Sequence, residues 1–175
     1  MEIYGIYLSF HKADEIIEKY KEQLMPAKRK RLVRLRKKED QLRLLAGDLL
    51  MQYGLYQEFG LEPKQLEIVY NTYGKPYISG YKYCYFNISH SHEWVVCAID
   101  KSEMGIDIEK VEEIDLDMIK IICNQEEYKI FYSKRISNYQ AKLYEMWTIK
   151  ESYTKGLGRG LSIPFSQINI NEKKK

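Results

Sequence analysis

The sequence predicts an α+β fold in which a small antiparallel sheet lies beside long helices. Two observations support this prediction: leucines recur at helical spacing between residues 27 and 59, and three short strand-like runs follow between residues 83 and 109. The chain of 175 residues is long enough to bury a core without disulfides or metals. The result should be a globular protein with helices on a sheet.

The first part of the chain contains the strands of the expected sheet. A strand is predicted over residues 2–8, a long helix from Ala27 to Phe59, and a strand over residues 66–70 that leads into a turn. Three strands joined as hairpins follow, over residues 83–89, 94–100 and 104–109.

Helical patterns return after residue 111. They cover residues 115–122, residues 124–133, and a longer helix from Asn138 to Lys155 that two nearby glycines end. A last strand is predicted over residues 165–170.

Cysteine usage and hydropathy indicate a cytoplasmic protein. The three cysteines are widely spaced and odd in number, which argues against a disulfide framework or a zinc site and favours reduced thiols. The longest uninterrupted apolar run, from Trp94 to Ile99, is far too short to cross a bilayer. We therefore expect no membrane partner.

Positive charge is concentrated in one segment. Nine lysines and arginines lie between residues 28 and 43 against two acids, so this segment carries +7 while the rest of the chain is acidic. A local excess of cations indicates a local anionic partner. A solvated helix face explains the stripe equally well. Binding of nucleic acid is also open, although no aromatic residue is interleaved with the cations for base stacking.

Two carboxylates, Asp107 and Glu109, alternate with apolar residues. In a strand they share one face, about 6.6 Å apart along the chain. Neighbouring carboxylates repel each other, and a hard cation such as Mg²⁺, held partly by a phosphate substrate, would relieve that repulsion. An exposed strand face beside Lys110 is the alternative interpretation.

A third carboxylate lies on the last predicted helix. Glu151 is flanked there by Lys150 and Lys155, so one surface offers an acid for metal or proton and cations for phosphate oxygens. A surface ion pair between Glu151 and Lys155 is the alternative. Trp147 is expected in the core, and Glu127 has the spacing of a reciprocal helix cap.

Two serines and two histidines end one predicted strand, in the order Ser89, His90, Ser91 and His92. They alternate between the faces of a strand, which argues against a zinc pair and against a serine–histidine nucleophile. Phosphate contacts from Ser89 and His90, or ordinary turn residues, remain as interpretations. The glycine-rich run KGLGRGLS follows a helix rather than a strand, so it does not fit a P-loop or a dinucleotide-binding loop.

Four motifs, taken in order, resemble the signature series of the surfactin-type 4′-phosphopantetheinyl transferases. They are YGKP at 73–76, FNISHS at 86–91, GIDIEK at 105–110 and WTIKESYTK at 147–155. The similarity begins at the opening MEIYGIY, includes KEDQLRLLAGD in the basic segment, and extends to about Ser166.

The resemblance implies a cytoplasmic enzyme that moves the phosphopantetheine arm of coenzyme A onto a serine of an acyl, peptidyl or polyketide carrier protein, with release of 3′,5′-ADP. It also implies two similar α/β halves about a pseudo-two-fold axis, with coenzyme A between them. We expect these halves at residues 1–110 and 111–175. The second is expected to be incomplete, because members of the family continue beyond Lys175. A monomer is expected, with self-association through the incomplete half as the alternative.

Motif matching also implies the catalytic residues. Asp107, Glu109 and Glu151 would hold Mg²⁺ with the coenzyme pyrophosphate, and Glu151 would be the base for the acceptor serine. Lys150 and Lys155 would contact the pyrophosphate and assist catalysis.

The other matched positions would bind the rest of the coenzyme. Those expected to bind its phosphates are Lys28, Arg31, Arg36 and Arg43. Those expected to line the nucleotide pocket are Lys75, Pro76, Ser89 and His90.

Two other functions compete with transfer. The first is a Mg²⁺-dependent nuclease that uses the same acids while the basic helix follows a nucleic-acid strand. The second is a non-catalytic remnant that binds coenzyme A but cannot position the acceptor.

Overall fold

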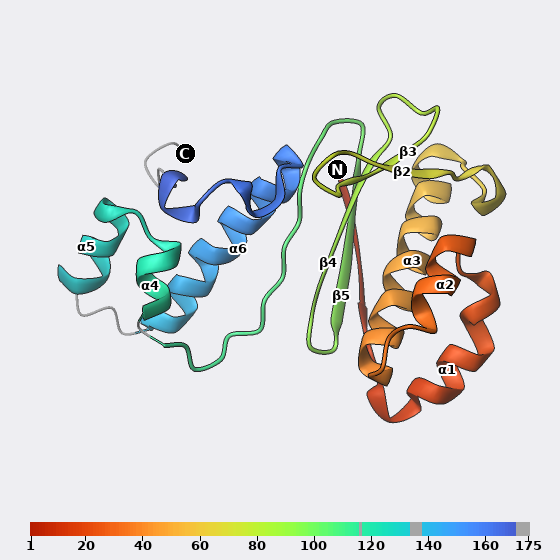
Figure 1. The fold of residues 1–175 in the computed structure, drawn as a ribbon, viewed down its shortest axis with the longest axis horizontal. Helices are drawn as coiled ribbons and strands as arrows, with labels where there is room; N and C mark the ends of the chain where they lie inside the picture. The colour runs from red at the N-terminus through yellow and green to blue at the C-terminus, as the bar shows by residue number, and fades with distance from the viewer. Residues whose placement is uncertain (116, 134–137, 171–175) are drawn as a thin grey trace.

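The computed structural model describes residues 1–115, 117–133 and 138–170. A three-stranded antiparallel sheet lies in the middle, with one group of helices on each side of it (Figure 1). The predicted α+β class is confirmed. The predicted division at residue 110 stays a prediction, and residues 116, 134–137 and 171–175 lie outside the described part.

The central sheet has the strand order β1-β5-β4. Its strands are β1 (Glu2–Tyr7), β4 (Tyr85–Ser91) and β5 (Trp94–Asp100). A separate two-stranded ribbon is formed by β2 (Ile68–Tyr70) and β3 (Pro76–Ile78). The first strand and the β4–β5 hairpin therefore confirm the strands predicted over residues 2–8, 83–89 and 94–100.

Alternation along β4 gives its two faces different chemistry. Phe86 and Ile88 pack toward α3 (Lys38–Phe59), in a core with Met51 and Cys97. The side chains between them point to the opposite face of the sheet. This second face carries Asn87, Ser89 and Ser91, which bind the segment that follows the sheet.

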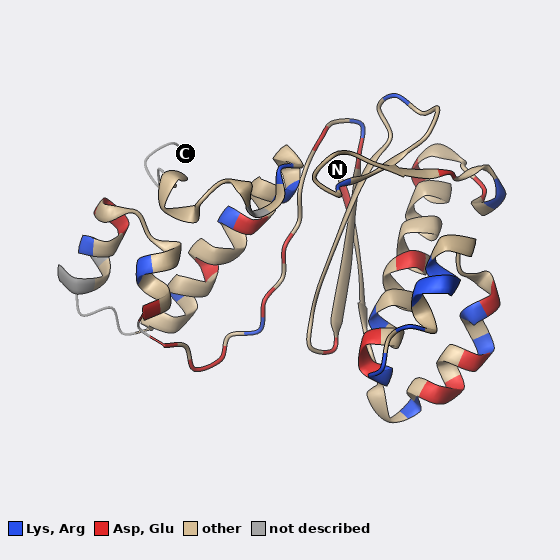
Figure 2. Ribbon diagram, viewed as in Figure 1, with Lys and Arg blue, Asp and Glu red and all other residues tan. Residues whose placement is uncertain are grey.

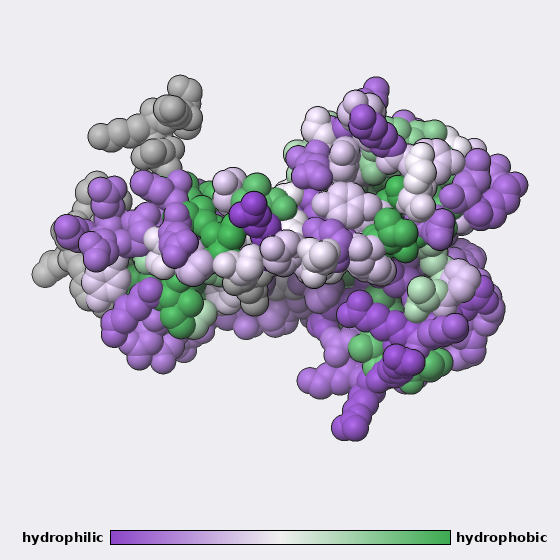
Figure 3. All heavy atoms as spheres, turned by 45° about the horizontal axis from the view of Figure 1, so that its top comes forward, coloured by the Kyte–Doolittle hydropathy of each residue, from purple (hydrophilic) through white to green (hydrophobic). Residues whose placement is uncertain are grey.

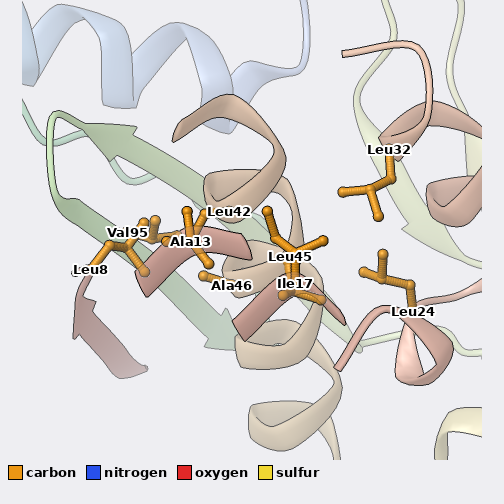
Figure 4. Packing of buried hydrophobic residues seen from close by; sticks show 9 residues of the cluster. All are labelled: Leu8, Ala13, Ile17, Leu24, Leu32, Leu42, Leu45, Ala46 and Val95. Atoms are coloured by element: carbon orange, nitrogen blue, oxygen red, sulfur yellow. The ribbon is translucent and has the colours of Figure 1, made fainter. Parts of the chain in front are cut away.

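The predicted helix from Ala27 to Phe59 is wrong, because the structure divides it into α2 (Pro26–Leu32) and α3. Residues 33–37 form the break, where the side-chain amide of Gln41 donates to the carbonyls of Leu32 and Leu35. The break lets α2 fold back, so that Leu32 joins the core that contains leucines of α3 (Figure 4). A continuous helix would have carried that leucine away from the core.

The remaining helix on the α3 side of the sheet is α1 (Ala13–Tyr20), which packs on α3. Short 3₁₀ helices complete the chain at Phe10–Lys12, Lys21–Gln23, Pro63–Gln65, Gly160–Ser162 and Phe165–Gln167. None of the helices in the described ranges is long and apolar enough to cross a membrane.

The second group of helices has its own core. It consists of α4 (Asp117–Ile122), α5 (Gln125–Ser133) and α6 (Tyr139–Leu157). Ile119, Ile122, Leu143 and Met146 form its buried centre. Hydrophobic areas nevertheless remain on the surface near both groups of helices (Figure 3).

The start of α5 and both ends of α6 follow the predicted capping patterns. The Asn124 and Glu127 side chains each accept from the other's backbone N–H, at 2.9 and 2.8 Å, which confirms the reciprocal cap. Asn138 caps α6, and Gly158 ends it in the left-handed conformation, with φ of 64°.

The predicted strand over residues 165–170 is wrong. The segment begins with the 3₁₀ helix at residues 165–167 and pairs with no strand in the part of the chain that is described. Its backbone groups bind side chains instead, since the Phe165 carbonyl accepts from Lys150 and the Ile170 N–H donates to Glu127. These side-chain bonds take the place of a strand ladder.

The predicted strand over residues 104–109 is also wrong as a member of the sheet. The segment lies across the face of β4 and is held by side chains, because Asn87 accepts from the Ile106 N–H at 2.9 Å and Ser91 accepts from the Lys110 N–H at 3.0 Å. It runs between the sheet and α6 (Figure 1). The alternation of Asp107 and Glu109 is preserved, so both carboxylates still share one face.

Gly105 allows this segment to touch α6. A Cβ at this position would overlap the carbonyl oxygen of Ser152. We expect Gly105→Ala to lower the free energy of unfolding by about 1–3 kcal/mol, because α6 must move away. Urea denaturation measures the loss, and Gly5→Ala is the control, since its Cβ would meet no atom nearer than 3.7 Å. Equal stability of Gly105→Ala and the parent would contradict this close approach.

Candidate active site

Three predicted carboxylates meet in one pocket between the sheet and α6. Asp107, Glu109 and Glu151 line this acidic pocket, which has a volume of about 220 Å³. Its other lining residues are Ile88, Ser89, His90, Trp147 and Lys155. Parts of the pocket thus come from the end of β4, from residues 107–109 after the sheet, and from α6.

The side chain of Asp107 is almost fully buried, at 2% exposed. Its Oδ1 atom accepts from the Ser89 hydroxyl at 2.7 Å and from the Lys155 ammonium at 2.5 Å. Its Oδ2 atom is buried and has no hydrogen-bond partner. A buried carboxylate oxygen without a partner is costly, so a ligand atom that it could bind would be stabilised there.

The other two acids are short of positive charge. Glu109 accepts from the Ser91 hydroxyl at 3.0 Å, yet burial raises the pKa of Glu109 and the charge of Asp107 raises it further. Burial also raises the pKa of Glu151, with Asp107 and Glu109 adding to the effect and Lys155 opposing it. An additional cation in the pocket would stabilise the charged form of both carboxylates.

The donor set fits a hard divalent cation such as Mg²⁺. All three acids offer oxygen, the unpartnered Oδ2 of Asp107 is an available acceptor, and a cation would oppose the mutual repulsion of the carboxylates. In their present positions, however, no three acid, histidine or cysteine side chains among the described residues are grouped closely enough to hold a metal ion. Binding would thus require side chains to move, and Lys155 is the group already in contact with Asp107.

A second, cationic pocket adjoins the acidic one. Its volume is about 450 Å³, and it lies among α2, α3, the β2–β3 ribbon and β4. The blue residues gathered on α2 and at the start of α3 show the source of its charge (Figure 2). Of the predicted coenzyme residues it is lined by Lys28, Arg31, Arg43, Pro76 and His90. Ile88 and His90 line both pockets, so the two share a wall at β4.

The cations of this pocket are partly fixed in place. Arg43 donates to the His92 carbonyl and to Asp40, both at 2.7 Å. Burial lowers the pKa values of Lys28 and of His90. Arg36, which was predicted to bind phosphate, lies in the break after α2 and is not among the lining residues.

Lys75 does not line the pocket as predicted. It is buried, and its ammonium donates to the Gly156 carbonyl near the end of α6 at 2.6 Å. Burial lowers its pKa. Asn71 donates to the Gly158 carbonyl at 2.8 Å in the same region. The turn between β2 and β3 therefore binds the C-terminal end of α6, where helix carbonyls attract positive charge.

Lys150 also differs from its predicted role. Its side chain is 0% exposed, and its ammonium donates to Glu127 at 2.5 Å and to the carbonyls of Ile122 and Phe165 at 2.8 and 3.0 Å. All three donors of the ammonium are used beside the core formed by α4, α5 and α6. The predicted contact of Lys150 with pyrophosphate does not fit this position, and neither does a direct catalytic role.

Three further residues shape the two pockets. Trp147, expected in the core, is half-buried, stacks on Tyr144 and lines the acidic pocket. Ser91 holds Glu109, and its alternation with Ser89 is the sequence signal that could have identified it. Asp48 lines the cationic pocket, where its Oδ2 accepts from the Met25 N–H and its Oδ1 has no partner. Asp48 is the last residue of the KEDQLRLLAGD match, but no role was predicted for it.

An acidic pocket beside a cationic one suits a substrate that carries phosphate groups. The model of the 4′-phosphopantetheinyl transferase superfamily matches residues 103–175, and the model of the 4′-phosphopantetheinyl transferase N-terminal region matches residues 13–102. The chain therefore belongs to the 4′-phosphopantetheinyl transferases, a family of transferase enzymes. The family predicted from the four motifs is confirmed.

Individual relatives agree with this assignment. The 4′-phosphopantetheinyl transferase Sfp of Bacillus subtilis (strain 168) is 35% identical over 97% of this chain and 76% of its own length. The 4′-phosphopantetheinyl transferase gsp of Aneurinibacillus migulanus is 38% identical over 83% of this chain and 60% of its own. The 4′-phosphopantetheinyl transferase HetI of Nostoc sp. (strain PCC 7120) is 31% identical over 71% of this chain and 55% of its own.

Proposed function

We propose that this protein transfers the 4′-phosphopantetheine arm of coenzyme A to a serine hydroxyl of a carrier protein and releases 3′,5′-ADP. The observation that carries the proposal is the wall that the acidic and cationic pockets share at Ile88 and His90. Coenzyme A has a pyrophosphate and a separate 3′-phosphate. A ligand with two phosphate groups could therefore place one in each pocket.

The cationic pocket is suited to the 3′-phosphate. Lys28, Arg31 and Arg43 surround it, and hydrogen bonds between such groups and phosphate oxygens are charge-assisted. The pyrophosphate would then extend past His90 toward the three carboxylates. Asp107, Glu109 and Glu151 would hold Mg²⁺ there, which when bound supplies positive charge to the pyrophosphate oxygens.

Glu151 is the proposed general base. It lies on α6 in the acidic pocket, and its raised pKa brings it nearer to the pH at which proton transfer is efficient. In the transfer step the serine oxygen forms a bond to the β-phosphorus and its proton passes to Glu151. The bond to the bridging oxygen breaks, and its electron pair leaves with 3′,5′-ADP. Lys155 supplies positive charge beside the reacting groups.

The direct test is incubation of the protein with coenzyme A, Mg²⁺ and a purified carrier domain. We expect the carrier to gain one phosphopantetheine group by mass spectrometry, and to gain none when a chelator removes the metal. A folded protein that binds coenzyme A without modifying any acyl, peptidyl or polyketide carrier would contradict the proposal and favour a binding remnant. Cleavage of an oligonucleotide that coenzyme A does not inhibit would instead favour a nuclease.

The assignment of the 3′-phosphate to the cationic pocket has its own test. We expect Arg31→Ala to raise the KM for coenzyme A by about 10- to 100-fold, because a hydrogen bond between charged groups is lost. The KM for dephospho-coenzyme A, which lacks the 3′-phosphate, should change little. Lys30→Ala is the matched control, since Lys30 is exposed on the same helix and does not line the pocket. An equal rise for both substrates would contradict this assignment.

A further inference from the structure

Lys155 places one positive charge in the acidic pocket, beside Asp107. Its ammonium contacts Oδ1 of Asp107 at 2.5 Å and the Ser89 hydroxyl at 3.0 Å. Glu109 and Glu151 line the same pocket. A single ammonium group therefore shares a pocket with three carboxylates, and it contacts Asp107 directly.

The ammonium and a divalent cation would compete for the same acid. Asp107 is almost fully buried, and its Oδ1 already accepts from both Lys155 and Ser89. Its Oδ2 is buried and unpartnered, and it is the atom most in need of a positive partner. A second cation at this carboxylate would be repelled by the ammonium that touches it.

Lys155 is more accessible to solvent than its partner Asp107. Its side chain is 30% exposed, while that of Asp107 is 2% exposed, so the lysine lies on the solvent side of the pair. A lysine ammonium is a compact charge on a flexible stem and can reach a second partner by rotating its side chain. A phosphate at the wall between the two pockets would offer such a partner.

We propose that Lys155 is an internal counter-ion that competes with the divalent cation for Asp107 and must release this carboxylate before the cation binds. The inference rests on the proposed metal role of the acidic pocket. It adds that the protein alone binds the cation weakly, because its own ammonium group already occupies Asp107. A phosphate-bearing substrate would favour metal binding by drawing Lys155 away from Asp107.

The test measures binding of Mn²⁺ alone, without coenzyme A or carrier, by calorimetry or by the electron paramagnetic resonance of the free ion. We expect Lys155→Met to bind Mn²⁺ at least about tenfold more tightly than the parent, since the competing charge is removed. Lys155→Arg, which keeps the charge, should bind as weakly as the parent. Lys110→Met is the matched control, because Lys110 is exposed and pairs with Glu112 outside the pocket. Its affinity for Mn²⁺ should change less than twofold.

Two further variants keep the inference open to refutation. Lys155→Gln removes the charge but keeps an N–H donor for Asp107, so tighter Mn²⁺ binding is expected even if Lys155→Met folds poorly. Adding Asp107→Asn to Lys155→Gln should abolish that gain, which would locate the ion at Asp107. Equal or weaker binding by the folded Lys155→Gln variant overturns the inference.

The outcome is separable from that of the proposed transfer. A gain in Mn²⁺ affinity with no modification of any carrier would support the counter-ion and contradict the transfer reaction. Carrier modification by the parent without a gain in Lys155→Met or Lys155→Gln would overturn the counter-ion and leave the transfer reaction intact.

Discussion

Replacing Lys150 by methionine is expected to lower the free energy of unfolding by about 3–5 kcal/mol, which is the usual cost of leaving one partner of a buried ion pair alone. Lys150 is completely buried, and its loss leaves the Glu127 carboxylate uncompensated. The carbonyls of Ile122 and Phe165 also lose their donor. Part of the loss thus comes from the segment after α6, which the lysine ties to α4 and α5.

Urea denaturation followed by circular dichroism measures this effect. The double variant Lys150→Met with Glu127→Gln should be more stable than Lys150→Met alone, because no buried charge remains uncompensated. Lys64→Met is the control, since it removes one partner of an exposed ion pair with Glu62 and should change stability little.

The kinetics of Lys150→Met also test whether Lys150 is a buried structural residue or makes the pyrophosphate contact first predicted for it. The folded fraction of Lys150→Met should keep a KM for coenzyme A close to that of the parent, because the ammonium does not reach the pocket. A stable Lys150→Met variant with a greatly raised KM would contradict the buried position and restore the predicted contact with pyrophosphate.

Replacing Asp107 by asparagine or Glu151 by glutamine is expected to lower kcat by about 10²- to 10⁴-fold. Removal of a general base or of a preorganised charge at a reacting phosphate commonly has an effect of this size. Both changes keep the size of the side chain, so the fold should survive. Rates of carrier modification, measured at equal folded concentrations, give the effect.

Glu145→Gln is the matched control for Glu151. It lies on α6 as well, but it is exposed, pairs with Lys142 and is not part of the acidic pocket. Its kcat should equal that of the parent. Parent-like activity of Asp107→Asn or Glu151→Gln would contradict the roles proposed for these acids.

Elements with a strong local pattern were predictable from the sequence. The strand at the N-terminus, the β4–β5 hairpin, the cap at Asn124 and the start of α6 at Asn138 all depend on neighbouring residues. The predictions were wrong where distant partners decide the conformation. The segment at residues 104–109 alternates like a strand, yet the serines and the asparagine of β4 bind it through their side chains and leave it outside the sheet.

The sequence by itself determined the family, from four motifs in order, and it identified the three carboxylates that line the acidic pocket. Only the tertiary structure decided which neighbouring groups face that pocket. Lys150 and Glu151 are adjacent on α6, where successive side chains point in directions about 100° apart. Helical spacing cannot tell which of them faces the acidic pocket, because that depends on what packs against each side of the helix. Glu127 and two carbonyls hold Lys150 in the core, while the segment bearing Asp107 and Glu109 meets the other side.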